Sequence, residues 1–369
     1  MKTYLDELTD EEKVRSRKAN PMETPIEESF TFGYRVTQRA LKFIKAHKDQ
    51  DFFLVVSYDE PHDPGLCPEP YASMYKDVEL EKTPAYSDDL QNKPALQRYW
   101  GARNMTEQAE QRPVKPARLL GCNSFVDDLL GRVMDAARTL TPDALRLFTS
   151  DHVDAIGAHR LFAKGPSIYD EIARVPLIME GPGVPAGAVY EHAVSHIDLP
   201  ATVLDWFHLP RPAMLEGRSL LPQVGDPALP TGRPAFVEFG RYEIDHDGFG
   251  GFQPMRAAVT DTWRLALHVL DTDELYNTAD DPYCLNNRIN DPSCQSERNA
   301  LHDQIIDWMN ATRDPFRGYQ WQARPWRASK QPSWDMEGYT RQRENDPGEY
   351  RQRDYGTGLP MEKATRLKG

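Results

Sequence analysis

The chain has 369 residues, enough to bury a large core in one or two domains. Its 57 acidic and 44 basic side chains give a net charge of −13, and no Lys/Arg run is interleaved with aromatic residues, so we expect no binding to nucleic acid. No apolar run approaches the roughly 18 residues of a membrane-spanning helix, and the charged residues 1–18 lack the apolar core of a secretory signal, so we expect a cytoplasmic protein without membrane contact.

The first regular elements are a helix and a strand. Apolar residues within 36–46 repeat at helical spacing, and the unbroken apolar run Phe52 to Val56 is typical of a strand buried on both faces of a sheet. Residues 60–117, rich in Pro and charge, show little periodicity and predict a long surface excursion.

Regular patterns return at residue 123. Residues 123–140 carry apolar side chains every third or fourth position, which predicts an amphipathic helix capped by Asn123 or Ser124. The elements expected next are a strand within 143–152, a strand within 174–183, and a helix within 196–210 capped by Asp198.

The pattern changes at about residue 231. Short, roughly alternating strands are predicted within 235–244, 255–262 and 263–270, followed by a helix within 301–314. We therefore expect three parts: an α/β core over 1–230 with a mostly parallel sheet flanked by helices, a smaller antiparallel-sheet-plus-helix (α+β) subdomain over 231–316, and an extended tail over 317–369 that docks through its tryptophans.

The four cysteines, Cys67, Cys122, Cys284 and Cys294, form no C-x-x-C motif. We interpret them as free thiols in a reducing compartment. The alternative is a disulfide between Cys284 and Cys294 in an exported protein.

Candidate functional side chains follow the predicted strands. His62 follows the run at 52–56, Asp151 and His152 follow the next strand, and Lys164 comes thirteen residues after Asp151. Ligands of parallel α/β sheets gather beyond the carboxyl ends of the strands, and a carboxylate beside an imidazole is a natural pair of metal ligands. The alternative for Asp151 and His152 is a capped turn.

Three further residues have open interpretations. His159 is either a substrate contact or a core histidine satisfied by hydrogen bonds, and Arg241 and His246 lie in the Gly-rich stretch "RYEIDHDGFGGF". That stretch either lines a specificity pocket or is a hydrogen-bonded structural loop.

Five stretches in a fixed order resemble the later two-thirds of a sulfatase of the alkaline phosphatase superfamily. They are "FFLVVSYDEPHDP", "FVDDLLGRVMDAA", "LRLFTSDHVDAIGAHRLFAKGPSIYDEIARVPLIMEGPG", "VSHIDLPATVLDWFHLP" and "DELYNTADDPYCLNNRI". The resemblance covers about Phe30 to Asp314. Residues 237–263, with "DPFRGYQWQARPWR" near the tail, look like the bacterial arylsulfatase and choline-sulfatase branch.

The resemblance implies an alkaline phosphatase-like α/β fold and metal-assisted hydrolysis of a small sulfated substrate by a formylglycine nucleophile. Matched to this sequence, Asp151 and His152 fall on metal-ligand positions, Lys164 on the sulfate-binding lysine, and His62 on the histidine that protonates the leaving group. The family implies calcium, whereas the imidazole of His152 shifts the preference towards manganese or zinc.

The sequence departs from the family pattern in two places. The C-x-P-S-R or S-x-P-S-R nucleophile motif and two further metal-binding aspartates have no counterpart, since "CPEP" at Cys67 lacks the arginine. Val153 replaces the usual glycine, which would store about 1 to 3 kcal/mol of strain if that position needs a positive φ.

We therefore expect this chain to be inactive alone and to be completed by an N-terminal fragment that complements it. The alternatives are a phosphonate or phosphodiester hydrolase of the same superfamily, or a truncated noncatalytic protein that binds or forms homo-oligomers through the tail.

Overall fold

The computed structural model describes residues 26–62, 65–104, 113–212, 215–240, 253–312 and 314–330. The chain divides into two compact units, Met1–Arg298 and Asn299–Gly369. The boundaries expected at 230 and 316 do not coincide with this division and stay a prediction.

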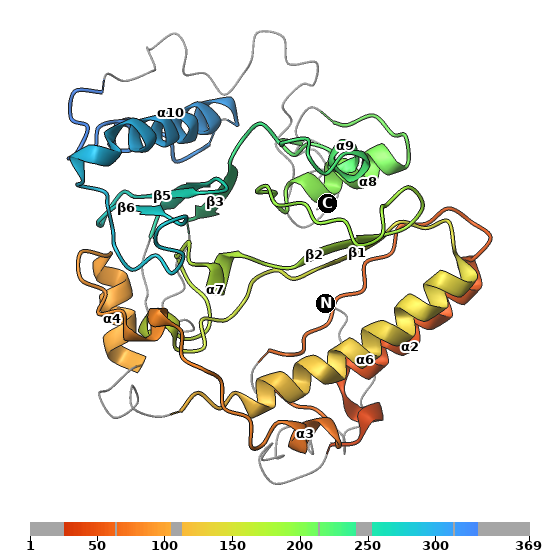
Figure 1. Cartoon of the computed structure of the whole chain (residues 1–369). Helices are drawn as coiled ribbons and strands as arrows, with labels where there is room; N and C mark the ends of the chain where they lie inside the picture. The colour runs from red at the N-terminus through yellow and green to blue at the C-terminus, as the bar shows by residue number, and fades with distance from the viewer. Residues whose placement is uncertain are drawn as a thin grey trace, which may run out of the picture. The chain divides into compact units, whose positions relative to one another are not determined.

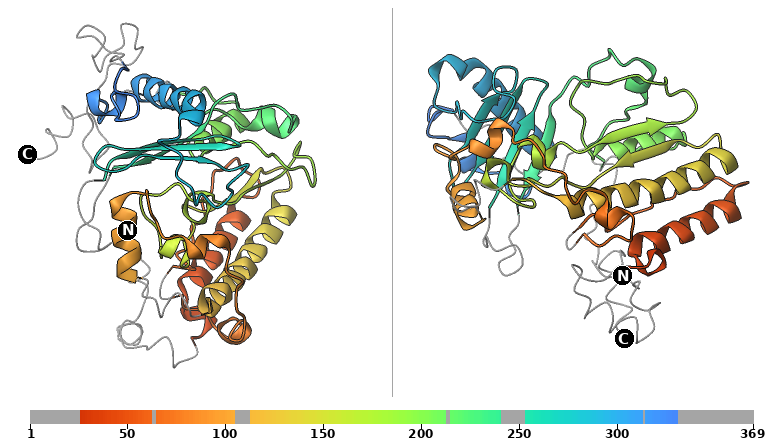
Figure 2. Two further views of the ribbon diagram at one scale, coloured as in Figure 1. Left: turned by 60° about the vertical axis from the view of Figure 1, so that its left-hand side comes forward. Right: turned by 60° about the horizontal axis from the view of Figure 1, so that its bottom comes forward.

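Two long helices lie side by side in the first unit (Figures 1 and 2). Helix α2 (Phe32–His47) follows the short 3-10 helix η2 (Glu28–Phe30), and the Thr31 hydroxyl caps it by accepting the Tyr34 N–H at 3.2 Å. Helix α6 (Ala117–Leu140) begins at Ala117, so the cap expected at residue 123 or 124 is wrong. The apolar stripe extends back through Gly121 and Cys122, both buried, and this burial prolongs the helix.

A bare glycine lets α6 approach a short helix, α3 (Tyr71–Met74). A Cβ atom at Gly121 would lie 2.3 Å from the carbonyl oxygen of Tyr71. Only glycine therefore allows this close contact without a backbone shift.

The segment 52–58 does not form the strand expected from its sequence. Leu54 and Val56 pack against a cluster of buried α2 and α6 side chains, and Tyr58 packs against a second cluster on α6. The intervening Phe53 and Val55 are 65% and 69% exposed. The segment thus has the alternation of a strand, with no partner strand among the described residues.

Strands β1 (Arg146–Thr149) and β2 (Leu177–Glu180) form at the expected places. They pair antiparallel, with Arg146 opposite Glu180 and Thr149 opposite Leu177. The parallel sheet expected for this part is therefore not seen among the described strands, because the only strand that β1 meets there runs the opposite way. Between them lie η4 (Ala158–Arg160) and α7 (Asp170–Ala173).

Helix α8 (Asp198–Trp206) begins with Asp198 rather than being capped by it, because Ile197 occupies the cap position. The carboxylate of Asp198 instead accepts the N–H groups of Ser195 at 3.1 Å and Arg218 at 2.9 Å. These bonds join both flanking segments to the helix start, and the short helix α9 (Leu221–Gly225) follows.

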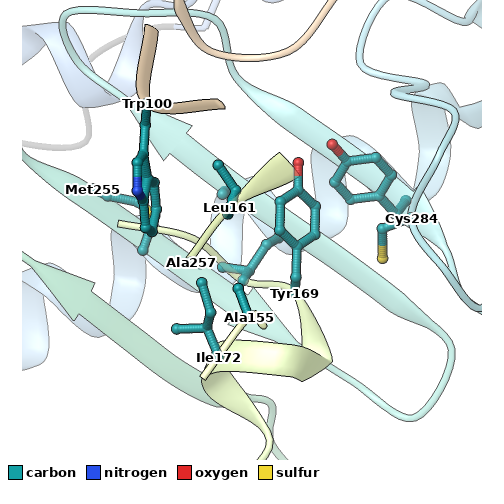
Figure 3. Close-up of a cluster of buried hydrophobic side chains, with 11 residues drawn as sticks. Trp100, Ala155, Leu161, Tyr169, Ile172, Met255, Ala257 and Cys284 are labelled. Atoms are coloured by element: carbon teal, nitrogen blue, oxygen red, sulfur yellow. The ribbon is translucent and has the colours of Figure 1, made fainter. Parts of the chain in front are cut away.

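The expected antiparallel sheet is confirmed and has four strands, β3 (Ala235–Phe239), β4 (Met255–Val259), β5 (Trp263–His268) and β6 (Glu274–Asn277), in that order. Its side chains join a hydrophobic cluster with Trp100, Leu161 and Tyr169 from earlier segments (Figure 3). The stretch 60–117 therefore does not lie wholly on the surface, as the sequence suggested. It contributes η3 (Pro84–Ser87), α4 (Ala95–Asn104) and buried side chains, because Trp100 and Leu90 are apolar enough to enter the core.

After η5 (Pro292–Cys294), helix α10 (Gln295–Ala311) runs into the second unit, where α11 (Tyr319–Gln322) follows. In that unit the Asp303 carboxylate accepts two bonds from Arg327, at 2.8 and 3.0 Å, and the Trp321 indole is buried. The first part of the expected tail is thus tied to α10, and its remainder lies outside the described residues.

Two sequence expectations concern cysteines and membranes. All four cysteines are free and buried, so the Cys284–Cys294 disulfide is excluded. Within the described ranges, no helix combines the length and the apolar character needed to span a bilayer.

Candidate active site

Asp151 and His152 turn two potential ligand atoms towards each other just after β1. The Asp151 Oδ1 atom accepts the His152 backbone N–H at 2.9 Å, and Oδ2 lies 3.5 Å from His152 Nε2. His152 Nδ1 lies 3.0 Å from the Val153 carbonyl oxygen. A carbonyl can only accept, so Nδ1 carries a proton, and Nε2 is the ring nitrogen that can offer a lone pair to a ligand. The bond at Oδ1 matches the capped-turn alternative, yet Oδ2 and Nε2 stay available.

The two side chains are of the types that bind a cation, but two ligands are too few to hold one. A metal-bound histidine commonly donates its other N–H to a backbone carbonyl, as His152 does. The Asp151 side chain is 86% exposed. Among the described residues, however, no group of three or more His, Cys, Asp or Glu side chains could hold a metal ion. A divalent cation at this pair would need additional oxygen ligands from elsewhere.

The loop that follows folds back and returns Lys164 towards its own beginning. Asp154 Oδ1 accepts the N–H groups of Ile156 at 2.8 Å and Ala163 at 3.0 Å, and the Ala155 N–H donates to the Ala163 carbonyl at 3.1 Å. Lys164, the next residue, is exposed. Its backbone therefore leaves the loop beside residues 154 and 155, close in the chain to the Asp151–His152 pair.

Backbone strain is concentrated in this loop but not where the sequence suggested. Val153 is not among the residues with positive φ, so the strain expected there is absent. Positive φ values occur instead at Ile156 (48°), His159 (52°), Arg160 (59°) and Ala163 (59°). Non-glycine residues hold such angles only where tertiary contacts impose them.

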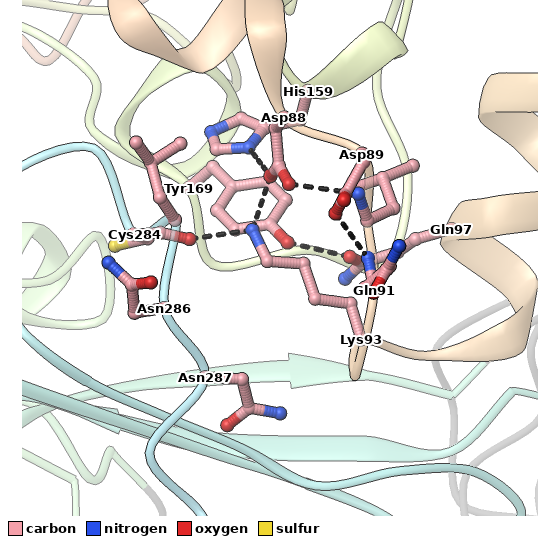
Figure 4. A network of polar contacts seen from close by, with 12 residues as sticks. Asp88, Asp89, Gln91, Lys93, Gln97, His159, Tyr169, Cys284, Asn286 and Asn287 are labelled. Atoms are coloured by element: carbon pink, nitrogen blue, oxygen red, sulfur yellow. Dashed lines mark hydrogen bonds and ion pairs between the residues drawn. The ribbon is translucent and has the colours of Figure 1, made fainter.

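Those contacts come from a buried ionic cluster of Asp88, Lys93 and His159 (Figure 4). Asp88 Oδ2 accepts a hydrogen bond from His159 Nδ1 at 2.6 Å and a short one from the Lys93 ammonium. The same ammonium donates to the Cys284 carbonyl at 2.6 Å, and Lys93 has no exposed surface. The cluster joins the segment 84–93, the loop and residue 284.

The cluster continues into a second set of buried polar groups. The His159 ring stacks on Tyr169, with centroids 3.7 Å apart, and the Tyr169 hydroxyl donates to Gln97 Oε1 at 2.6 Å. Glu274 accepts from the Tyr276 hydroxyl at 2.7 Å and lies 2.8 Å from His268 Nε2. The loop is thereby tied to strands β5 and β6.

The charges of the cluster are mutually supporting. Burial alone would raise the pKa of Asp88, but the hydrogen bond from His159 and the positive charge of Lys93 outweigh it and lower that pKa. The pKa of the fully buried Glu274 is lowered in the same way, since the hydrogen bond and charge of His268 outweigh burial. Both carboxylates are thus held ionised.

The other predicted site residues, His159, His62, Arg241 and His246, differ in what the structure shows of them. His159 is 1% exposed and held by Asp88, which favours the core-histidine alternative over substrate contact. The segment that carries His62 is held against α2: the Tyr58 hydroxyl lies 2.9 Å from Thr37 Oγ1 and Glu60 Oε1 accepts the Gly33 N–H at 2.9 Å. The His62 N–H donates to Asp59 O at 3.0 Å. Arg241 and His246 lie outside the described residues.

Asp88 and Lys93 were missed by sequence reasoning. Asp88 is 71 residues from His159, and Lys93 is 191 residues from Cys284. No local pattern reports such pairs, because the partners meet only in the tertiary structure. The only hint in the sequence was that the Pro-rich stretch containing Asp88 and Lys93 also contains Trp100 and other apolar residues, which could have indicated that part of it is buried.

Comparison with protein families gives two overlapping matches. The sequence profile described as "Sulfatase" matches residues 2–209. The profile described as "N-sulphoglucosamine sulphohydrolase, C-terminal" matches residues 157–311. Together they cover both the loop after β1 and the four-stranded sheet.

Two curated relatives show how much of a longer protein is represented. The chain is 40% identical over 374 residues to the uncharacterized sulfatase YidJ of Escherichia coli (strain K12), a match that covers 97% of this chain and 72% of YidJ. It is 27% identical over 256 residues to the choline-sulfatase of Rhizobium meliloti (strain 1021), covering 65% of this chain and 46% of that enzyme. The chain thus spans about three-quarters of one relative and less than half of the other.

Solved structures support the fold. BT4656 in complex with its substrate D-glucosamine-2-N,6-O-disulfate matches with a TM-score of 0.66 at 16% identity, over 77% of this chain and 70% of that one. The phosphonate monoester hydrolase SpPMH from Silicibacter pomeroyi matches with a TM-score of 0.64 at 24% identity, over 77% and 61%. The alkaline phosphatase-like α/β class expected from the sequence is therefore confirmed.

Proposed function

Because this chain belongs to the sulfatase family, we propose that it supplies part of the active site of a metal-assisted hydrolase of sulfate esters. The observation that carries the proposal is the convergence of Asp151 Oδ2 and His152 Nε2, 3.5 Å apart, with the tautomer of His152 fixed by the Val153 carbonyl. A small sulfated compound is the substrate class that this family membership favours.

The roles follow from the charge that develops during sulfuryl transfer. A divalent cation held by Asp151 and His152 would supply positive charge to the sulfate oxygens. The Lys164 ammonium binds the same oxygens, and losing one such donor typically costs roughly 3 kcal/mol of transition-state stabilisation. The oxygen of the nucleophile would form the new bond to sulfur as the S–O bond to the alcohol breaks. The leaving oxygen would take a proton from His62, since imidazole exchanges protons near neutral pH.

The printed sequence does not provide the nucleophile. It contains no C-x-P-S-R or S-x-P-S-R motif, and the Asp151–His152 pair needs further ligands. We propose that both come from polypeptide not represented here, so that this chain by itself turns over no sulfate ester. Family membership favours calcium as the metal, whereas an imidazole ligand, His152, shifts the preference towards manganese or zinc.

A phosphonate or phosphodiester hydrolase is the second candidate. Its support is the fold match to a phosphonate monoester hydrolase, whose TM-score of 0.64 is nearly that of the sugar disulfate-bound structure, 0.66. A tetrahedral phosphonate and a sulfate present similar oxygens to a cation and a lysine. Side-by-side assays of 4-nitrophenyl sulfate and a 4-nitrophenyl phosphonate monoester separate the two reactions.

Metal binding tests the site without requiring turnover. Calorimetric titration with Mn²⁺ of the full chain, mixed with the part of YidJ outside the match, is expected to show binding that weakens about tenfold or more in Asp151→Asn and in His152→Ala. The matched control is Asp261→Asn, since the exposed Asp261 carboxylate also faces a histidine, the partly buried His192, at 2.6 Å. Equal binding by all variants, or equal loss in the control, contradicts the assignment.

Turnover is measured with the complete set of polypeptide. The chain is mixed with the part of YidJ outside the match and assayed with 4-nitrophenyl sulfate. Sulfate release that disappears in Lys164→Ala supports the proposal. Neither metal binding nor turnover would favour the noncatalytic alternative.

Two further expectations stay predictions. Four buried free thiols are what a reducing compartment favours, and we propose a cytoplasmic location on that basis and on composition. An oligomer formed through residues 317–369 is likewise a proposal, to be checked by the molar mass in solution.

A further inference from the structure

Two of the four buried cysteines, Cys67 and Cys122, are neighbours in the structure. Both belong to one cluster of contacting buried side chains. The Cys122 Sγ atom lies 3.6 Å from the carbonyl oxygen of Leu66, the residue before Cys67, although 56 residues separate Leu66 from Cys122 in the sequence. A Cβ atom at Gly121 would lie 3.5 Å from Cys67 Sγ. The first turns of α6 thus hold one thiol against the segment that carries the other.

The surroundings make the two thiols chemically unequal. The single proton of the Cys122 thiol has two acceptors within reach, the Leu66 carbonyl oxygen and the Cys67 sulfur. The hydrogen bond from Cys122 lowers the pKa of Cys67, since together with the positive charge of Arg118 it outweighs burial and the negative charge of Glu69. The same hydrogen bond and burial raise the pKa of Cys122. Cys67 therefore ionises first, and Cys122 keeps its proton.

Exposure gives the same order of reactivity. Cys67 is 7% exposed, whereas Cys122 has no exposed surface, so a small oxidant meets Cys67 first. The other two cysteines, Cys284 and Cys294, are each 2% exposed. Burial raises the pKa of Cys284 to about 12, and among the described residues the cluster that contains Cys284 has no second cysteine. Cys284 is thus an internal control for the reactivity of Cys67.

We propose that Cys67 and Cys122 form a redox site, in which a peroxide oxidises Cys67 and Cys122 then closes a disulfide with it. The Cys67 thiolate attacks one oxygen of hydrogen peroxide, the O–O bond breaks, and the other oxygen leaves as hydroxide. Cys67 becomes a sulfenic acid. The Cys122 sulfur then attacks the Cys67 sulfur, and the S–O bond breaks as the disulfide forms.

The reaction balances with the peroxide as the only oxidant. The two sulfurs together lose two electrons, which reduce the O–O bond. The hydroxide from the peroxide takes the proton that Cys67 released, and the hydroxide from the sulfenic acid takes the proton of Cys122. Two thiols and one peroxide give one disulfide and two waters. A dithiol reductant reverses the change by thiol–disulfide exchange.

The disulfide would connect two parts of the chain that already touch. The chain between Cys67 and Cys122 is long and includes the segment 84–93, which carries Asp88 and Lys93 of the buried ionic cluster. A covalent link that closes a long loop limits the freedom of the unfolded chain and so favours the folded one. The oxidised protein should therefore unfold at a higher urea concentration than the reduced protein. Neither sulfate nor a metal takes part, so the site is independent of the proposed function.

Mass spectrometry of the full chain tests the site directly. The reduced protein is treated with a few equivalents of hydrogen peroxide, denatured in iodoacetamide and digested without reductant. We expect one peptide pair joined through Cys67 and Cys122, lighter by two hydrogen atoms than the two free peptides and separated by dithiothreitol. The pair should form at least about tenfold faster than Cys284 is oxidised, and Cys284 and Cys294 should carry the alkyl label.

Three variants assign the order of steps. Cys122→Ala removes the second thiol, so the sulfenic acid at Cys67 should persist and be trapped by dimedone. Cys67→Ala should leave Cys122 unmodified, because its pKa is raised and it is buried. The control Cys294→Ala should form the disulfide at the rate of the parent chain. Alanine suits these positions because a buried cysteine packs as a small apolar side chain.

Three results would overturn the proposal. The first is the absence of a Cys67–Cys122 bond within one chain at a peroxide dose that has oxidised half of Cys284. The second is oxidation of Cys122 in Cys67→Ala as fast as in the parent chain. The third is a urea midpoint of the oxidised parent no higher than that of the reduced parent. The first and third use the unsubstituted chain, so they decide the matter even if a variant fails to fold.

Discussion

Replacing Asp88 with Asn should destabilise the protein strongly, because Asp88 is the anion of a buried ionic cluster. Its Oδ2 atom accepts bonds from Lys93 and His159, and its Oδ1 atom accepts the Leu90 N–H at 2.9 Å. The side chain of Lys93 has no exposed surface and that of Asp88 only 3%. In Asp88→Asn the Lys93 ammonium stays buried without a negative partner.

The magnitude follows from that uncompensated charge. Removing one partner of a buried pair typically costs about 3 to 5 kcal/mol. The asparagine carbonyl can keep at most two of the three bonds, because its NH₂ group replaces the other oxygen. We therefore expect the lower end, about 3 kcal/mol, a large share of a typical total stability of about 5 to 15 kcal/mol. Lys93→Met leaves the Asp88 carboxylate with two hydrogen-bond donors, His159 and the Leu90 N–H. The stability lost by the double variant, Asp88→Asn with Lys93→Met, should be smaller than the sum of the two single losses by about 1 to 3 kcal/mol.

Urea denaturation followed by tryptophan fluorescence and circular dichroism measures these differences. The control is Arg132→Gln, which removes a partly exposed cation from Glu28 and Asp128 and should cost less than about 1 kcal/mol. If Asp88→Asn costs no more than this control, or if the Asp88 and Lys93 losses add without coupling, the reasoning is refuted.

The pH dependence gives an independent check on Asp88. Burial opposes its ionisation, yet the His159 hydrogen bond and the charge of Lys93 lower its pKa in the folded chain. A carboxyl whose folded pKa is depressed stabilises fully above its unfolded pKa, about 3.9, and loses that contribution as the pH falls towards the folded value. Asp88→Asn should therefore show a shallower loss of stability below about pH 4 than the parent chain.

Two further predictions use other sites. In helix α6, Gly121→Ala should destabilise the protein by about 1 to 3 kcal/mol, because the new Cβ would lie 2.3 Å from the Tyr71 carbonyl oxygen. Gly131→Ala, whose Cβ would meet no atom within 4 Å, should stabilise it by about 0.5 to 1 kcal/mol. Urea midpoints of the two variants that move in the same direction would contradict this. Burial raises the pKa of Glu60, so the folded state loses stability as the pH rises above about 4.5. Glu60→Gln, which keeps an acceptor for the Gly33 N–H, should remove that decline and raise the thermal midpoint at pH 7, and an unchanged pH profile would refute it.

The sequence anticipated the elements whose periodicity is local. The stripe within 36–46 located α2, and the alternating stretches after residue 231 located three of the four strands of the antiparallel sheet. The ends of helices were harder to predict from the sequence. Asp198 is a residue type that often caps a helix, but here it is the first residue of α8 and its carboxylate binds the N–H groups of Ser195 and Arg218.

The candidate site was predictable only in part, for a physical reason. Asp151 and His152 are adjacent, so their convergence needed only a turn, and the structure provides it. The apolar run at 52–56 predicted a strand in a sheet. Its side chains alternate between packed and exposed, as in a strand, but no strand among the described residues pairs with it. Asp88 and His159, which shape the loop, meet across 71 residues and leave no local trace.

The four positive φ angles between Ile156 and Ala163 imply an order of assembly. An isolated chain avoids these angles, so the loop cannot adopt its shape until Asp88 binds His159 and Asp154 holds the N–H groups of Ile156 and Ala163. We therefore expect the segment that carries Lys164 to become ordered only after these contacts have formed. On this expectation the protein becomes compact before the loop reaches the shape that the proposed function requires of it.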